Sequence, residues 1–230
     1  MAFAKKAATT TVDIKPMELV TVNLTIVGMT PLIVHVWSHK AMQQMLDKQT
    51  GKAKRAKHDI KIPVNDFMDS LYWLTEQPAH GESDEDAMSN FEAAISNGAR
   101  FGFPVTGIKQ SVISGAGRGG LDVKMTELRG SFFLAGGTDA ATSELAEIVG
   151  PAPVMREDTV MVGGMSRTAD IRHRGEFREW SIPLRMTYNA NGKYTLEQLL
   201  NCFNHGGFVT GIGEWRPEKD GQYGMYRLEI

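Results

Sequence analysis

The stretch FREWSIPLRMTY, residues 177–188, decides the fold because it carries the clearest strand pattern in the chain. Apolar side chains recur at alternate positions, apart from a slip near Glu179, and this is the period of a strand with one buried face. The sequence NANG, residues 189–192, follows directly and is typical of a turn. We therefore expect a strand over residues 177–188 that ends in a tight turn.

The elements beyond this turn complete the C-terminal third of the chain. Thr195, with Gln198 three residues later, is a capping pair that predicts the start of a helix. The helix has an apolar face and ends at Gly206-Gly207. Residues 223–230 are predicted to form the last strand, so a helix and a glycine-rich loop separate two strands.

The elements before residue 177 fix the fold class. Residues 20–27 alternate as a strand, and residues 32–34 are a second extended piece. Helices are predicted over residues 65–74, 85–97 and 107–114, and strands over residues 128–134 and 154–162. The order predicts an α+β fold. It suits one domain, residues 1–230, with a ferredoxin-like βαββαβ core and a long basic-loop and helical insertion at residues 38–100.

Composition places the chain among ordinary globular proteins. Of 230 residues, 42% are hydrophobic and 23% are charged, with a formal net charge of −2. These values exclude a largely disordered chain and a uniformly basic, histone-like nucleic-acid binder. The single cysteine, Cys202, excludes an intramolecular disulfide framework and a cysteine-rich zinc site. No apolar run is long enough to span a bilayer, and no hydrophobic signal-peptide core follows Lys6, so we expect a cytoplasmic protein with no membrane partner. We also expect no metal and no cofactor.

Two blocks of opposite charge lie side by side in the sequence. Residues 40–61 hold seven basic residues against two acidic ones, and residues 66–92 hold eight acidic residues and no lysine or arginine. The first block predicts a basic loop that grips phosphates through Lys52, Lys54, Arg55 and Lys57. The alternative is a solvated surface loop. Contact between opposite blocks of identical chains would join them head to tail in a ring or filament.

The strongest local signal is the glycine-rich stretch GGFVTGIGEWRP, residues 206–217, followed by GQYG, residues 221–224. Glycines such as Gly211 and Gly213 let a backbone approach a ligand closely. Trp215 and Arg216 add a stacking plane and a cation, which together suit single-stranded nucleic acid. The stretch is neither a Walker loop nor a dinucleotide fingerprint. The alternative is a glycine-rich turn with a buried tryptophan.

A second signal is the run of arginines between residues 156 and 185, which contains six arginines, no lysine and five acidic residues. Arginine without lysine indicates bidentate recognition of phosphate or carboxylate, and Arg172 and Arg174 are the candidates. Internal ion pairs are the alternative. No catalytic set is assigned, although His35, His173 or His205 would suit a metal-independent ribonuclease.

The C-terminal stretch GIGEWRPEK, residues 211–219, with GQYGMY, residues 221–226, resembles the terminal glycine-rich loop of the RAMP superfamily. These are RNA-recognition-motif-like proteins that include the backbone subunit of CRISPR effector complexes. The chain also looks like proteins carried by tailed bacteriophages, through MRED, residues 155–158, and ADIR, residues 169–172. The resemblance implies a ferredoxin-like fold, self-assembly along a nucleic-acid strand, and backbone contacts from the glycine loop. No catalytic histidine of the superfamily matches.

Three functions are compatible with the sequence. The first is a non-enzymatic, phage-encoded protein that binds single-stranded RNA or DNA and forms a homo-oligomer in the cytoplasm of the infected host. Its contacts would come from Lys52, Lys54, Arg55, Lys57, Arg172, Arg174, Gly211, Gly213, Trp215 and Arg216. The second is a phage structural or host-defence-interaction protein that assembles through the charge blocks. The third is the ribonuclease.

Overall fold

The computed structural model describes residues 16–36, 39–51, 61–118, 120–136, 144–162 and 168–229. Within them, strand β1 (Leu19–Gly28) pairs with β8 (Ser181–Asn189) along nine residues, antiparallel. Strand β4 (Phe132–Gly136) lies on the other side of β8, and β9 (Tyr226–Glu229) lies on the other side of β1. The result is a four-stranded antiparallel sheet in the order β4-β8-β1-β9.

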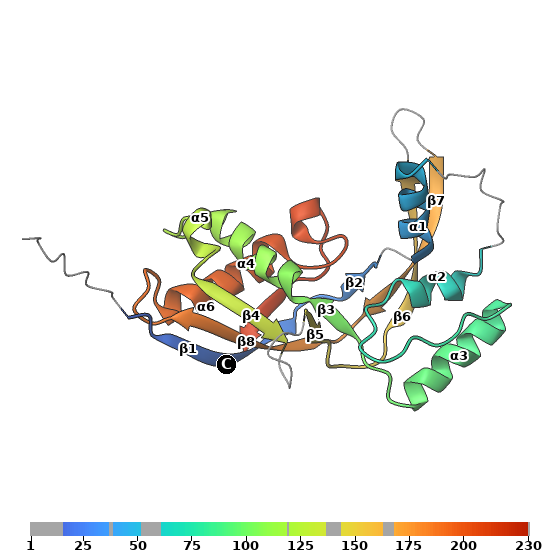
Figure 1. The fold of residues 1–230 in the computed structure, drawn as a ribbon, viewed down its shortest axis with the longest axis horizontal. Helices are drawn as coiled ribbons and strands as arrows, with labels where there is room; N and C mark the ends of the chain where they lie inside the picture. The colour runs from blue at the N-terminus through green and yellow to red at the C-terminus, as the bar shows by residue number, and fades with distance from the viewer. Residues whose placement is uncertain are drawn as a thin grey trace, which may run out of the picture.

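Two helices cover one face of this sheet (Figure 1). These are α4 (Val105–Arg118) and α6 (Leu196–His205), which contact each other, and α4 continues toward the short α5 (Met125–Leu128). Thr195 caps α6 in the predicted capping box with Gln198. The last turn of α6 widens into a π-helical turn, η1 (Gly206–Thr210), from which the glycine-rich loop departs.

Most of the remaining elements lie toward the other end of the molecule, whereas β3 (Gly102–Pro104) and β5 (Leu145–Glu147) lie near its middle beside β4 and β8 (Figure 1). Strands β2 (Leu32–Val34), β6 (Val154–Val162) and β7 (Thr168–Phe177) form a second sheet in the order β2-β7-β6. Strands β3 and β5 pair with each other. The helices at that other end are α1 (His39–Gln49), α2 (Pro63–Asp69) and α3 (Asp84–Ser96). A subdomain over residues 38–100 stays a prediction.

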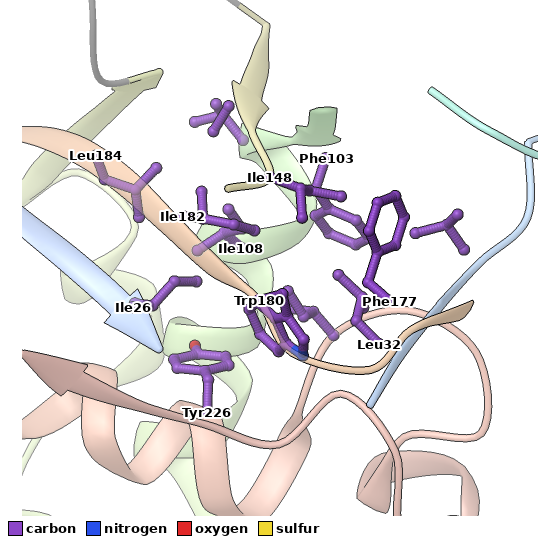
Figure 2. Close-up of a cluster of buried hydrophobic side chains, with 14 of the residues drawn as sticks. Ile26, Leu32, Phe103, Ile108, Ile148, Phe177, Trp180, Ile182, Leu184 and Tyr226 are labelled. Atoms are coloured by element: carbon purple, nitrogen blue, oxygen red, sulfur yellow. The ribbon is translucent and has the colours of Figure 1, made fainter. Parts of the chain in front are cut away.

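The core lies between the four-stranded sheet and its helices, and it continues toward β7 (Figure 2). Inward positions of β1 and β8, among them Ile26, Ile182 and Leu184, are almost fully buried. Tyr226 of β9 is also fully buried and shares a hydrogen bond of 3.1 Å with Ser111 of α4. Trp180 packs against Gly28, whose missing side chain leaves room for the indole. The combination of helices with antiparallel sheets confirms the predicted α+β class.

The last predicted strand begins at Tyr226 rather than at Tyr223, and two other predicted strands differ from the observed ones because of a neighbouring element. The slip near Glu179 marks a break, because β7 ends at Phe177 and β8 begins at Ser181. The strand predicted from Leu128 begins at Phe132 instead, since Leu128 is the buried end of helix α5 and a turn follows it. In both cases a buried apolar residue belongs to a neighbouring element rather than to the strand. No helix in the described ranges is long and apolar enough to cross a membrane.

Candidate nucleic-acid interface

The hairpin of β6 and β7 carries most of its charges on one face, whereas Glu157 lies on the other. Its register sets Arg156 opposite Arg174 and Asp158 opposite Arg172. Residues that are directly opposite on neighbouring strands share a face, and like charges at such positions repel. Asp158 resolves this repulsion, because it accepts hydrogen bonds from Nε of Arg156 at 2.9 Å and from Nη1 of Arg174 at 3.0 Å. Glu176 accepts a further one from Arg156 at 2.8 Å.

These charges are buried. The side chain of Arg174 is 4% exposed and that of Asp158 is 9% exposed. Burial alone would raise the pKa of Asp158, but the hydrogen bonds from Arg156 and Arg174 outweigh it and hold the pKa below its usual value. The alternative considered for the arginine run, an internal ion pair, is thus present at Arg174, whose buried guanidinium is paired with Asp158.

The glycine-rich loop is tied to the protein by its own backbone. Glu214 N donates to Ile33 O at 2.9 Å, and Ile212 N donates to Gly224 O at 2.9 Å. Gly213 has a φ of +77°, and a Cβ there would lie 2.3 Å from Ile33 O. Gly211, with a φ of +66°, donates its N–H to Gly206 O. Both glycines therefore shape the loop, and the N–H of Gly211 is engaged within the protein.

The hairpin and the loop meet through the same arginines. Arg156 donates to the hydroxyl of Tyr223 at 3.2 Å, and its guanidinium lies 4.7 Å from the centre of that ring. Nη2 of Arg174 lies 3.8 Å from the carboxylate of Glu214. A hollow of about 380 Å³ lies between the two segments, and we call it the basic groove. Its lining is Val160, Met161, Arg172, Arg174, Glu214, Trp215, Arg216 and Lys219.

The basic groove brings together four of the predicted site residues. Arg172 is partly exposed, 3.6 Å from Asp170. Trp215 is 41% exposed and has a φ of +51°, a strained conformation for a bulky residue and one that concentrates at functional sites. Arg216 forms two hydrogen bonds with Glu218 and one with Gly213 O. Gly211 and Gly213 line an adjoining hollow. Lys52, Lys54, Arg55 and Lys57 lie outside the described residues.

The sequence interpretation missed two charged groove residues, Glu214 and Lys219. Both lie in the glycine-rich loop, where no regular pattern of side chains exists, so their charge was the only sequence feature that could have identified them. A second signal was present in the hairpin, where charges recur at every second position: Arg156 and Asp158 on one strand, and Arg172, Arg174 and Glu176 on the next. Alternation of this kind places charges on one face of a strand, where they can pair with charges of the neighbouring strand, and it therefore indicates ion pairs within the hairpin rather than a phosphate-binding site.

The three histidines considered for ribonuclease chemistry lie in three different segments of the fold. His173 is buried with Nε2 3.5 Å from the carboxylate of Glu157, and His35 lines the hollow next to the groove. His205 is in the last turn of α6. In the described ranges, no group of three or more His, Cys, Asp or Glu side chains is placed to hold a metal ion. Burial raises the pKa of the Cys202 thiol to about 11.

No family model matches this chain. No curated protein matches it in sequence. Among solved structures, the crystal structure of Cmr6 from Pyrococcus furiosus aligns over 92% of this chain and 99% of that chain, with a TM-score of 0.33 and 11% sequence identity. A likeness of this size assigns no function to the chain.

Gly213→Ala tests whether the loop needs glycine for its own packing. The variant introduces a side chain at positive φ and a Cβ 2.3 Å from Ile33 O, so we expect a loss of about 3 kcal/mol or more in the free energy of unfolding. Gly98→Ala is the control, because φ is +81° but no atom lies within 4 Å, and we expect about 1 kcal/mol. Urea unfolding measures both. Equal losses would contradict the packing role.

Asp158→Asn tests the buried ion pair. Removing the carboxylate leaves Arg174 charged and buried, so we expect a loss of about 3–5 kcal/mol in urea unfolding at neutral pH. Asp170→Asn, at an exposed pair with Lys61, should lose less than about 1 kcal/mol. Because the pKa of Asp158 is lowered on folding, its contribution is present above the unfolded pKa and is lost as the pH falls through the folded value. A variant with unchanged stability and acid sensitivity would overturn this assignment.

Proposed function

We propose that this protein binds single-stranded nucleic acid, without a chemical step, through the basic groove. The observation that carries the proposal is the meeting of Arg172, from the hairpin, with Trp215 and Lys219, from the glycine-rich loop, around one hollow. A partly exposed tryptophan beside cations is the arrangement that holds a base by stacking and its phosphates by charge.

The cations of the groove contribute unequally. Arg174 is neutralised by Asp158, and Arg216 is held by Glu218, so these two shape the wall and its potential. Arg172 and Lys219 are the side chains that we assign to phosphates. With few phosphate contacts, binding by one chain is weak and has a modest salt dependence. Lys52, Lys54, Arg55 and Lys57 belong to the proposal as further phosphate contacts predicted from sequence.

Trp215→Ala tests this proposal most directly. Loss of base stacking should weaken binding of fluorescein-labelled oligouridine and oligothymidine by about 5–150-fold in an anisotropy titration at low salt. Lys219→Ala should weaken binding less and reduce the salt slope by about 0.7. The control is Arg100→Ala, which removes an exposed arginine paired with Glu147 away from the groove. No binding by wild-type protein at low salt would overturn the proposal.

The finer statements about the fold are part of the same proposal. We propose a ferredoxin-like, RAMP-like βαββαβ core formed by β1, α4, β4, β8, α6 and β9. The order β4-β8-β1-β9, antiparallel throughout and with both helices on one face, supports it. Residues 38–100 are then an insertion between the first strand and the first helix. We propose a bacteriophage origin and action in the cytoplasm of the infected host, on the resemblance of MRED, residues 155–158, and ADIR, residues 169–172.

We also propose that identical chains assemble head to tail, with the acidic block of one chain against the basic block of the next. Glu82, Asp84, Glu85 and Asp86 are exposed at the start of α3 and support this proposal. Asp84 also accepts from Val64 N, so it has a structural role as well. The same contact would serve the alternative function, a phage structural or host-defence-interaction protein that assembles without nucleic acid.

The double variant Glu82→Lys, Glu85→Lys should reduce the assembly of nuclease-treated protein, measured by size exclusion with light scattering, to the 25.3 kDa monomer. Both residues are exposed, so reversal of their charge removes attraction for the basic block without disturbing the core. Glu197→Lys, at the exposed start of α6, is the matched control and should assemble normally. A wild-type protein that stays monomeric at all concentrations contradicts the proposal.

A further inference from the structure

A second hollow of about 200 Å³ adjoins the basic groove, and we call it the ring pocket. Glu214 and Arg216 line both hollows, so the two share a wall. The ring pocket is further lined by the aromatic side chains of His35, Tyr72 and Phe103 and by the polar side chains of Gln110 and Thr210. Its volume is below the range of drug-sized sites and leaves room for one flat ring system.

The ring pocket contains polar atoms without partners. Thr210 is 1% exposed, and its Oγ1 has no hydrogen-bond partner in the part of the chain that the structure describes. Nδ1 of His35 is likewise buried and unpartnered among these residues. A buried polar atom left unpaired costs about 1–3 kcal/mol, so two beside one hollow point to a ligand that supplies the missing bonds.

The backbone at Thr210 is also unusual. Thr210 is the last residue of the π-helical turn η1, and Gly211 N closes this turn on Gly206 O at 2.9 Å. Single π-helical turns are rare and frequently occur at functional sites. Ser111, which also lines the pocket, is already bonded to Gly206 O and to Tyr226, so of these two aliphatic hydroxyls Thr210 is the one available to a ligand.

The chemistry of the lining selects a class of ring. Both carboxylate oxygens of Glu218 already accept from Arg216 and Arg118. The carboxylate of Glu214 also only accepts hydrogen bonds, so a matching ligand presents N–H groups to it. Burial, then the charge of Glu214, raises the pKa of Tyr72, so its phenol remains a donor. Burial, then the charge of Arg174, lowers the pKa of His35, so its ring is neutral at physiological pH. A planar ring with an N–H edge and a carbonyl fits this set.

We propose that the ring pocket holds one amino-bearing nucleobase, with guanine the best match, from a strand whose phosphates lie in the adjoining basic groove. The N1–H and amino group of guanine would donate to a carboxylate, and its carbonyl would accept from Thr210, Tyr72 or Gln110. Uracil and thymine present a single N–H between two carbonyl acceptors at this edge, so a carbonyl oxygen would face the carboxylate of Glu214 and disfavour binding. The inference rests on the proposed function, because the strand delivers the base.

The test compares oligouridine with the same strand carrying one central guanosine, by anisotropy titration of the whole protein at low salt. We expect the guanosine to tighten binding about tenfold, the range of one good bidentate contact. Thr210→Val keeps the shape of the side chain and removes the hydroxyl, so it should abolish most of this preference while oligouridine binding is unchanged. Glu214→Gln should also abolish most of the preference by removing the carboxylate, but because Glu214 lines the basic groove as well, it should change oligouridine binding too. Thr21→Val, at an exposed position of β1, is the matched control and should keep the preference.

The outcomes separate this inference from the proposed function. Equal affinity of wild-type protein for both strands overturns the ring pocket and leaves strand binding intact. Failure to bind either strand overturns the proposed function, and guanosine monophosphate is then titrated alone. Saturable binding of the nucleotide that Thr210→Val removes supports a base site supplied from free nucleotide. No binding of the nucleotide overturns the base site as well.

Discussion

The hydrogen-bonded ion pairs of Asp158 with Arg156 and Arg174 are the interaction on which the rest of the interface depends. Each buried charge loses several kcal/mol of hydration, and only close pairing offsets that loss. The pairing requires one register of β6 against β7, because a slip of one residue would turn the arginines to the opposite face. The same arginines contact Tyr223 and Glu214, so the register of the hairpin also sets where the glycine-rich loop lies.

This network explains why an arginine-rich segment belongs to a chain of net charge −2. Three arginines of this segment, Arg156, Arg174 and Arg178, are paired with two carboxylates of the same hairpin, Asp158 and Glu176. The charge left for a ligand is local, at Arg172 and Lys219, beside an exposed tryptophan. A strand held here is recognised more by stacking and by the shape of a narrow groove than by a broad positive surface.

The sequence predicts those parts of the molecule in which neighbours along the chain decide the structure. Alternation finds β1 and most of β8, and the Thr195 and Gln198 pair finds the start of α6. The interface is harder because its partners are far apart in sequence: Arg174 meets Glu214 forty residues on, and Tyr72 shares a hollow with Thr210. The glycines illustrate the difference. Their number signals a special loop, but only the structure shows that Gly213 makes room for Ile33 O.

The glycine-rich loop acts as a wall between two hollows, and this constrains what either can bind. Its position is fixed by backbone bonds to Ile33 and Gly224, so Glu214, Trp215 and Arg216 have little freedom to rearrange around a ligand. Arg216 is further fixed between Glu218 and Gly213 O. A ligand that spans both hollows thus meets a preorganised surface and loses little free energy in ordering it. Because Glu214 and Arg216 belong to both hollows, a change in either side chain alters phosphate and ring binding together.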